Sequence, residues 1–267
     1  MMIYPEITKR NFCASSLIVT LGSVLPTISP AAADAQSILA ISDAIRNPGQ
    51  AFRVTVTLTE FDNGVQAESS TLTSYARTVT PGGQFSNILR FELPARDAGK
   101  LILKSGNDIW FFDPATKASV RLSPQQRLLG QASNGDVVAV NFSKDYSARI
   151  DSEETIQDGE RRQRKAIKLA LIAASTDAAY SLIDFWVDAE KFSPLKAKFN
   201  SESGRTLKTA YYRQYQQQLG AIRPTETVII DGINTKSVTI VRLTDFAARN
   251  IPATWFTRDY MARFQPE

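Results

Sequence analysis

Residues 104–146, KSGNDIWFFDPATKASVRLSPQQRLLGQASNGDVVAVNFSKDY, form the stretch that decides how this 267-residue chain folds. Runs at 108–113 and 118–122 have the composition of short strands, and Ser123-Pro124 then places a helix N-cap before proline at the first helical position. Apolar side chains are dense throughout, and the stretch contains no cluster of residues that could act as a catalytic centre. It predicts strands that lead into a helix, in a protein that holds an apolar ligand rather than transforming one.

The same strand pattern recurs along most of the chain. Apolar and polar residues alternate over 52–59, and Asp62-Asn63-Gly64 has the composition of a hairpin turn. Further strands are expected at 69–79, 85–93, 100–104, 108–113, 118–122, 148–156, 163–173, 179–188, 194–200, 206–215, 225–231 and 237–246. Amphipathic spacing predicts helices at 36–46, 125–131 and 252–264. The expected fold class is therefore mainly β with a few helices.

An antiparallel sheet of this length cannot stay flat, because the twist between neighbouring strands accumulates. It must curl toward a barrel or split into a sandwich, and three helices can cover one face or one mouth at most. Aromatic residues are frequent on the expected strands, so a curled sheet would enclose a large apolar interior. The sequence leaves open whether side chains fill this interior or leave it hollow.

The N-terminal residues 1–33 have the pattern of a secretory signal peptide. Two basic residues precede an apolar run at 12–28, and small residues at 31–35 follow it with A-x-A cleavage sites. A membrane anchor is the alternative, but glycine and proline interrupt the run. Cys13 lies at the start of the run, which does not fit the acylated cysteine of a lipoprotein. We expect export, with 34–267 as one domain.

The composition excludes several classes of function. Cys13 is the single cysteine and the chain has no histidine, so the exported protein would lack both residue types. Disulfides, Cys or His nucleophile relays and the common zinc sites are then excluded. The formal net charge of +4 is too small for a nucleic-acid-binding face. We therefore expect no cofactor, no metal and no nucleic acid partner.

Three local patterns could suggest chemistry, and each has a simpler interpretation. Residues 193–196 match S-x-x-K but lack the accompanying serine-acylation motifs, so a turn entering a strand is favoured. Residues 161–165 are basic and follow an Asp-Gly turn, which favours a solvated hairpin over contact with anionic headgroups. Asp151, Glu153 and Glu154 are the densest carboxylates, but nothing nearby is set to desolvate one of them. No catalytic residue is predicted.

Several motifs, in this order, resemble the periplasmic outer-membrane lipoprotein-sorting proteins of the LolA-like superfamily. They are residues 106–114 (GNDIWFFDP), 123–130 (SPQQRLLG), 133–146 (SNGDVVAVNFSKDY), 185–188 (FWVD), 193–196 (SPLK), 204–209 (GRTLKT) and 223–225 (RPT). The resemblance covers nearly all of 34–267. It implies a strongly curved antiparallel half-barrel whose apolar concave face is partly covered by helices.

The resemblance also implies a function. Proteins of this kind carry lipoprotein acyl chains or another lipid between the inner and outer membranes, as monomers without catalysis. The partners implied are an inner-membrane transporter as donor and an outer-membrane acceptor. The likeness is to the broader branch of the superfamily, so the cargo stays open between a lipid and a lipoprotein. The missing lipobox argues against the receptor members anchored in the outer membrane.

The apolar strand faces and the predicted helices supply the candidate binding residues. Each buried methylene is worth about 0.8 kcal/mol, so a long acyl chain left in water would cost on the order of 10 kcal/mol. Trp110 and Phe112 should share one face of their strand, with Phe111 on the other. The residues expected to line the cavity are Phe52, Val54, Val56, Leu58, Leu89, Phe91, Trp110 and Phe112, and those expected on a helical lid are Leu128, Leu129, Trp255, Phe256 and Met261.

Two other classes of function remain as alternatives. A β-rich envelope hydrolase would need two carboxylates about 5–10 Å apart across a polar cleft. A scaffold that binds a membrane transporter would have a filled core and an exposed apolar patch.

Overall fold

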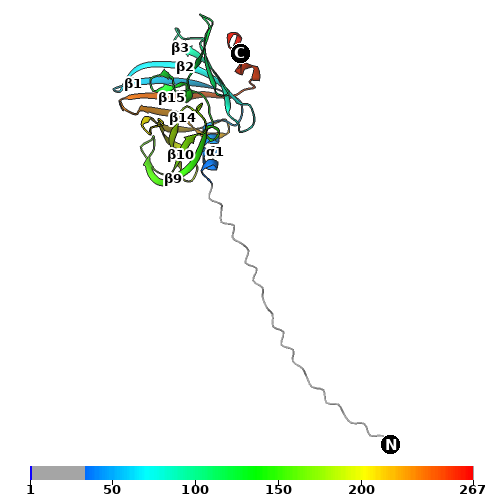
Figure 1. Ribbon diagram of the computed structural model, residues 1–267, viewed down its shortest axis with the longest axis vertical. Helices are drawn as coiled ribbons and strands as arrows, with labels where there is room; N and C mark the ends of the chain where they lie inside the picture. The colour runs from blue at the N-terminus through cyan, green and yellow to red at the C-terminus, as the bar shows by residue number, and fades with distance from the viewer. Residues whose placement is uncertain (2–33, 267) are drawn as a thin grey trace. The chain divides into compact units, whose positions relative to one another are not determined.

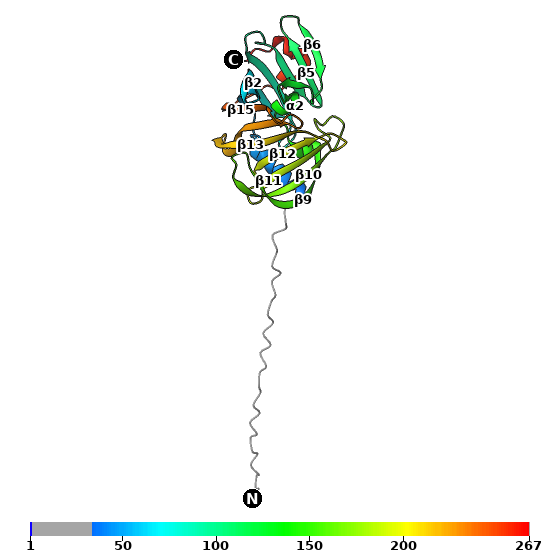
Figure 2. The same cartoon turned by 90° about the vertical axis from the view of Figure 1, so that its left-hand side faces the viewer.

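Thirteen antiparallel strands form one open sheet in the computed structural model, which describes Met1 and residues 34–266. The order of neighbours is β6-β5-β4-β3-β2-β1-β15-β14-β13-β12-β11-β10-β9. Figures 1 and 2 show this order running from β6 and β5 at one end of the unit to β9 at the other. The expected signal peptide lies, apart from Met1, outside the described residues. No helix among the residues described is long and apolar enough to cross a membrane.

The sheet consists of two meanders that meet in its middle. The first contains β1 (Phe52–Asp62), β2 (Val65–Thr78), β3 (Phe85–Leu93), β4 (Leu101–Ser105), β5 (Asp108–Asp113) and β6 (Ala118–Leu122). The second contains β9 (Tyr146–Gln157), β10 (Gln163–Ala173), β11 (Leu182–Asp188), β12 (Pro194–Asn200), β13 (Thr206–Gln218), β14 (Ala221–Asp231) and β15 (Ser237–Ala248). Pairing of β1 with β15, with Val56 opposite Leu243, joins the two. The predicted curved sheet that does not close into a barrel is confirmed.

The concave face of the sheet carries the main apolar core. Phe52, Val54, Val56 and Leu58 of β1 are buried, and the residues between them are partly exposed. This alternation follows from the side-chain period of two in a strand. The helix α1 (Ala35–Arg46) packs on this face against β9, β12 and β14, as predicted for 36–46 (Figure 1).

A second apolar cluster lies on the convex face of the sheet. The C-terminal segment contributes to it through two 3-10 turns, η1 (Ala253–Phe256) and η2 (Arg258–Arg263), which contact β3, β4 and β5. The Trp255 ring meets the ring of Tyr75 edge to face, with centroids 5.4 Å apart. Figure 1 shows this segment beside β3. A continuous C-terminal helix was expected here, but the extended backbone at Thr257 divides the segment.

The predicted helix at 125–131 is wrong. The segment instead forms a hairpin of β7 (Arg127–Leu129) and β8 (Ala132–Ser133), turned at Gly130, whose φ is +53°. Ser123-Pro124 opens a single turn, in which the Gln126 amide donates to the Ser123 carbonyl at 3.1 Å. The left-handed backbone at Gly130 cannot continue a helix. Helical structure begins only afterwards, in α2 (Asn134–Val137) and α3 (Phe142–Asp145).

Gly130 should be required for this hairpin to pack on the sheet. A Cβ there would overlap Thr239 Oγ1 and lie 3.0 Å from the Glu60 side chain. We expect Gly130→Ala to lower the free energy of unfolding by about 2–4 kcal/mol, the sum of overpacking and left-handed strain. Urea denaturation measures this loss.

Gly106→Ala is the matched control. Gly106 has a φ of +56° and nothing within 4 Å of its added Cβ, so only the backbone strain of about 1–2 kcal/mol should appear. Equal losses for the two variants would contradict close packing at Gly130.

Candidate ligand-binding site

Residues 123–145 connect the two edges of the sheet, and we call them the crossover. They follow β6 at one edge and precede β9 at the other. Leu129, Ala132, Val137, Val138 and Phe142 of the crossover belong to the core on the concave face. The crossover therefore covers the concave face in the place where a lid helix was predicted (Figure 2).

A cavity of about 160 Å³ lies between the crossover and the sheet. Its walls come from both halves of the sheet and its roof from the crossover. The apolar lining comprises Phe52, Val54, Val56, Ile109, Val137, Val138, Ala139, Val140, Phe142, Ala178, Ala179, Phe199, Ala210, Ile229, Val241, Leu243 and Phe246. The exposed lining residues Asn107, Ser175 and Asp177 mark where the cavity reaches the surface.

The size of the cavity limits what it can hold with the crossover in place. An apolar protein cavity of about 150 Å³ binds a ligand the size of benzene. A long acyl chain is several times larger, so it could enter fully only if the crossover moved away from the sheet. The contacts that hold the crossover down therefore determine how the site could open.

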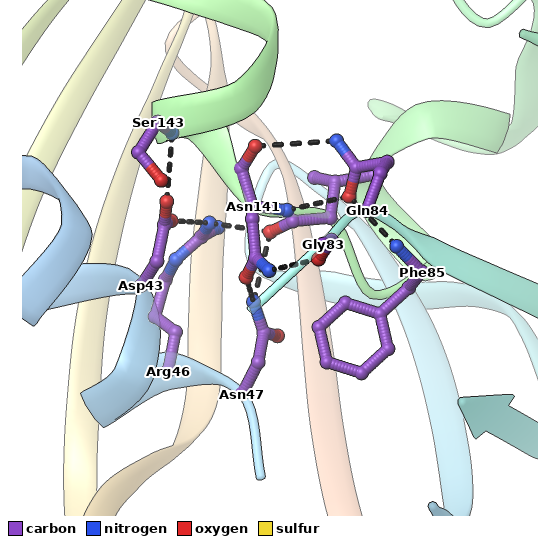
Figure 3. Close-up of polar contacts among 9 residues, drawn as sticks. Asp43, Arg46, Asn47, Gly83, Gln84, Phe85, Asn141 and Ser143 are labelled. Atoms are coloured by element: carbon purple, nitrogen blue, oxygen red, sulfur yellow. Dashed lines mark hydrogen bonds and ion pairs between the residues drawn. The ribbon is translucent and has the colours of Figure 1, made fainter. Parts of the chain in front are cut away.

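One set of contacts joins the crossover to the start of β3. Asn87 binds the backbone of Ala139 in both directions, donating to its carbonyl and accepting from its amide at 2.9 Å each. Gln84 does the same for Asn141, accepting from its amide at 2.8 Å and donating to its carbonyl at 3.2 Å. Figure 3 shows Gln84 and Asn141 in this arrangement, with the Asn141 side chain donating to the Gly83 carbonyl.

A second set joins the crossover to the end of α1 (Figure 3). The Arg46 guanidinium donates to the Val140 carbonyl at 2.8 Å and to Asp43 at 2.7 Å. It also lies 3.9 Å from the centre of the Phe142 ring. The other oxygen of Asp43 accepts from the Ser143 amide at 2.7 Å. This ion pair on α1 thus provides partners for backbone groups of the crossover, and Asn47 donates to the same Val140 carbonyl at 2.8 Å.

A third set holds the start of α2 against β13. The Lys208 ammonium forms a buried ion pair with Asp136 and donates to Ser133 Oγ at 3.0 Å. Asp136 also accepts from the Ser133 amide at 2.7 Å and from the Tyr180 hydroxyl at 3.2 Å. Burial raises the pKa of Tyr180 well above its usual value, so its hydroxyl stays neutral. These groups form a compact polar network inside an otherwise apolar face.

The structure divides the predicted binding residues between the two faces. Phe52, Val54 and Val56 line the cavity. Five others lie in or against the core of the concave face without lining it: Leu58, Leu89, Phe91, Leu128 and Leu129. The remaining five lie in the convex-face cluster, so the expectation that they line or cover the cavity is corrected: Trp110, Phe112, Trp255, Phe256 and Met261.

Strand register explains the correction. Trp110 and Phe112 do share one face of β5, with Phe111 on the other, as predicted. They pair with Leu103 and Leu101, which face the C-terminal segment on the convex side. The alternation of side chains along a strand shows which residues share a face, but it does not show which of the two faces is the concave one.

Sequence reasoning missed the wall contributed by the second meander. Ala210, Tyr212, Ile229 and Val241 on β13 to β15 line the cavity opposite β1. Their strands were expected and their alternation is clear in the sequence. The missing fact was that β15 pairs with β1, which brings the second meander next to the strand that carries Val54 and Val56.

The patterns that could have suggested chemistry lie away from the cavity. Asp151 on the edge strand β9 forms an ion pair with Lys168, with 2.9 Å between the carboxylate oxygen and the ammonium nitrogen. This contact holds the pKa of Asp151 below its usual value. A general acid would need the opposite shift. Residues 193–196 form the predicted turn into β12. Among the described residues, no group of acidic residues is placed to hold a metal ion.

Comparisons with known proteins identify structural relatives. A family model described as "Uncharacterized protein" matches residues 83–263, and no curated protein sequence matches the chain. The crystal structure of a LolA superfamily protein from Nitrosomonas europaea superposes with a TM-score of 0.76. It is 32% identical over 86% of this chain and 100% of that chain.

Two more distant crystal structures share the fold. A domain from Vibrio parahaemolyticus, named as a candidate outer membrane lipoprotein-sorting protein, has a TM-score of 0.69 and 17% identity over 86% of this chain and 98% of that chain. A DUF1329 family protein from Desulfovibrio piger has a TM-score of 0.70 and 17% identity over 84% and 96%.

The Lys208–Asp136 pair should be needed to keep the crossover in place. Lys208→Met would leave a buried carboxylate without its cation, which costs about 3–5 kcal/mol. We expect that loss in the free energy of unfolding, measured by urea denaturation. Hydrogen exchange should also speed up at residues 131–137.

The double variant Lys208→Met with Asp136→Asn is the control, since it removes both charges. It should recover part of the lost stability. A loss of less than about 1 kcal/mol in the single variant, the range of an exposed ion pair, would contradict a structural role for this contact.

Proposed function

The chain belongs to the LolA superfamily, and from this premise we propose that it is a periplasmic carrier that binds lipoprotein acyl chains or another lipid. The observation that carries the proposal is the apolar cavity between the sheet and the crossover. The walls of this cavity are rigid strands and its roof is a short irregular segment. This arrangement provides a preformed apolar surface with a cover that can move.

Burial of methylene groups would supply the affinity. Each methylene contributes about 0.8 kcal/mol when it leaves water, so a carrier must enclose most of an acyl chain. Phe52, Val54 and Val56 would contact the chain from β1, and Val241 and Ile229 from the second meander. Moving the crossover away from the sheet would extend this surface toward the rest of the concave core.

Release would depend on how the crossover is held. Its contacts with β3 and α1 are mostly hydrogen bonds between side chains and backbone, such as those of Asn87 with Ala139. Each such bond contributes a net 0.5–1.5 kcal/mol or so, because water replaces the partner when it opens. A cover held in this way can exchange protein contacts for water, which favours reversible opening.

The rest of the proposal follows from the sequence and the family. Residues 1–33 would direct export and be removed, leaving a monomer without cofactor or catalysis. An inner-membrane transporter would deliver the cargo and an outer-membrane acceptor would receive it.

Mass spectrometry of an organic extract from the natively purified protein tests the proposal. We expect lipids or acylated peptides to be present in the extract and absent from the extract of a denatured and washed sample. A fluorescent acyl probe should bind the washed protein. An extract without lipid, together with no probe binding, would rule the carrier function out.

Filling the cavity should reduce binding of the probe. Ala210 lines the cavity and is buried, so Ala210→Leu would occupy space that the ligand needs. The loss of contact with about two methylenes corresponds to a roughly tenfold lower affinity. Fluorescence titration measures the change.

Thr209→Leu is the matched control on the same strand. Thr209 pairs with Lys198, on the face opposite Ala210, so probe affinity should not change. An equal loss in both variants would place the binding surface elsewhere.

A further inference from the structure

Most residues that line the cavity are apolar, but one of them is a buried lysine, Lys104. Lys104 on β4 pairs with Asn87 on one side and Ile109 on the other. Asn87 binds the crossover and Ile109 lines the cavity, so this register directs Lys104 to the concave face. Its side chain lines the cavity, and the residue is only 9% exposed.

The Lys104 ammonium has few partners in this position. It donates one hydrogen bond, to the Gly106 carbonyl at 2.9 Å, and an ammonium has three donors. The other cationic residue of the cavity lining, Arg46, forms an ion pair with Asp43. Lys104 forms no ion pair with any described residue. A buried charge without a counterion is costly, unless a ligand supplies one.

The Asp145 carboxylate acts on Lys104 through its charge, and it also lines the cavity. Burial lowers the pKa of Lys104, and the attraction of Asp145 opposes this only partly. Burial likewise raises the pKa of Asp145, which weakens its ability to serve as a permanent counterion. The two groups lie too far apart for an ion pair, which leaves the ammonium available to a ligand.

The position of Lys104 suggests how a ligand would lie. Gly106, which accepts from Lys104, is followed by Asn107, one of the exposed residues where the cavity reaches the surface. Asn107, in the turn between β4 and β5, donates to Asp177, in the connection between β10 and β11, at 2.8 Å. Lys104 is therefore close to the opening, and the apolar residues of β1 lie farther in.

We propose that Lys104 is a headgroup site, and that the cavity takes amphiphiles with an anionic carboxylate or phosphate at the end of an apolar chain. The chain would enter first and lie against Val54 and Val56, and the anion would remain near the opening on the Lys104 ammonium. This inference rests on the proposed carrier function and adds the chemical class of the ligand.

Calorimetric titration with decanoate, decyl phosphate and decanol tests the proposal, because the three ligands share one chain and differ in the headgroup. A charge-assisted hydrogen bond corresponds to a roughly 10- to 100-fold gain in affinity. The wild-type protein should therefore bind at least one of the two anions about tenfold more tightly than decanol. A preference for the phosphate would indicate a phospholipid, and a preference for the carboxylate a fatty acid.

Lys104→Met should abolish this preference, so that neither anion binds more tightly than decanol to the same variant. Because it removes an unpaired buried charge, the variant should be at least as stable as the wild type in thermal unfolding. Lys196→Met is the matched control. Burial also lowers the pKa of Lys196, but this residue lies beside Trp186, outside the cavity.

The outcomes separate this inference from the carrier function. Equal binding of all three ligands by the wild type, or a preference that survives in Lys104→Met, would overturn the anion site and leave the carrier function standing. Failure of the wild type to bind any of the three would overturn both.

Discussion

The pairing of β1 with β15 in the middle of the sheet is the constraint on which the rest of the structure depends. Because the two meanders grow outward from this pair, the last strand of the first meander, β6, and the first strand of the second, β9, lie at opposite edges. The connection between them must cross the sheet. The C-terminal segment covers β3, β4 and β5 on the convex face, and the crossover passes over the concave face.

A crossing segment of irregular backbone creates a second requirement. Its amide and carbonyl groups leave water, and buried backbone groups need partners. Asn87 and Gln84 on the sheet, and Arg46 and Asp43 on α1, supply these partners. The crossover therefore explains why these four polar residues lie inside an apolar face. They fix its position on the concave face.

Most of the strands could be predicted from the sequence, but fewer of the residues that line the cavity could be. Runs of strand-forming residues bounded by turn residues predicted β3, β5 and β10 with their observed ends. The pattern failed for the crossover, where Ser123-Pro124 suggested a helix but Gly130 turns a hairpin. It also could not assign Trp110 to the convex face. Both faces of β5 are buried under different covers, so apolar character alone does not distinguish core from cavity.

The two covers differ in the side chains that they place against the sheet. On the convex side, large rings interlock, as where Trp255 meets Phe264 with centroids 4.9 Å apart. On the concave side, the roof over the cavity is a run of small side chains, VVAV at 137–140. Small residues leave space where large ones would fill it. A carrier needs this asymmetry, since one cover must keep the sheet rigid and the other must leave room beneath it and be able to move.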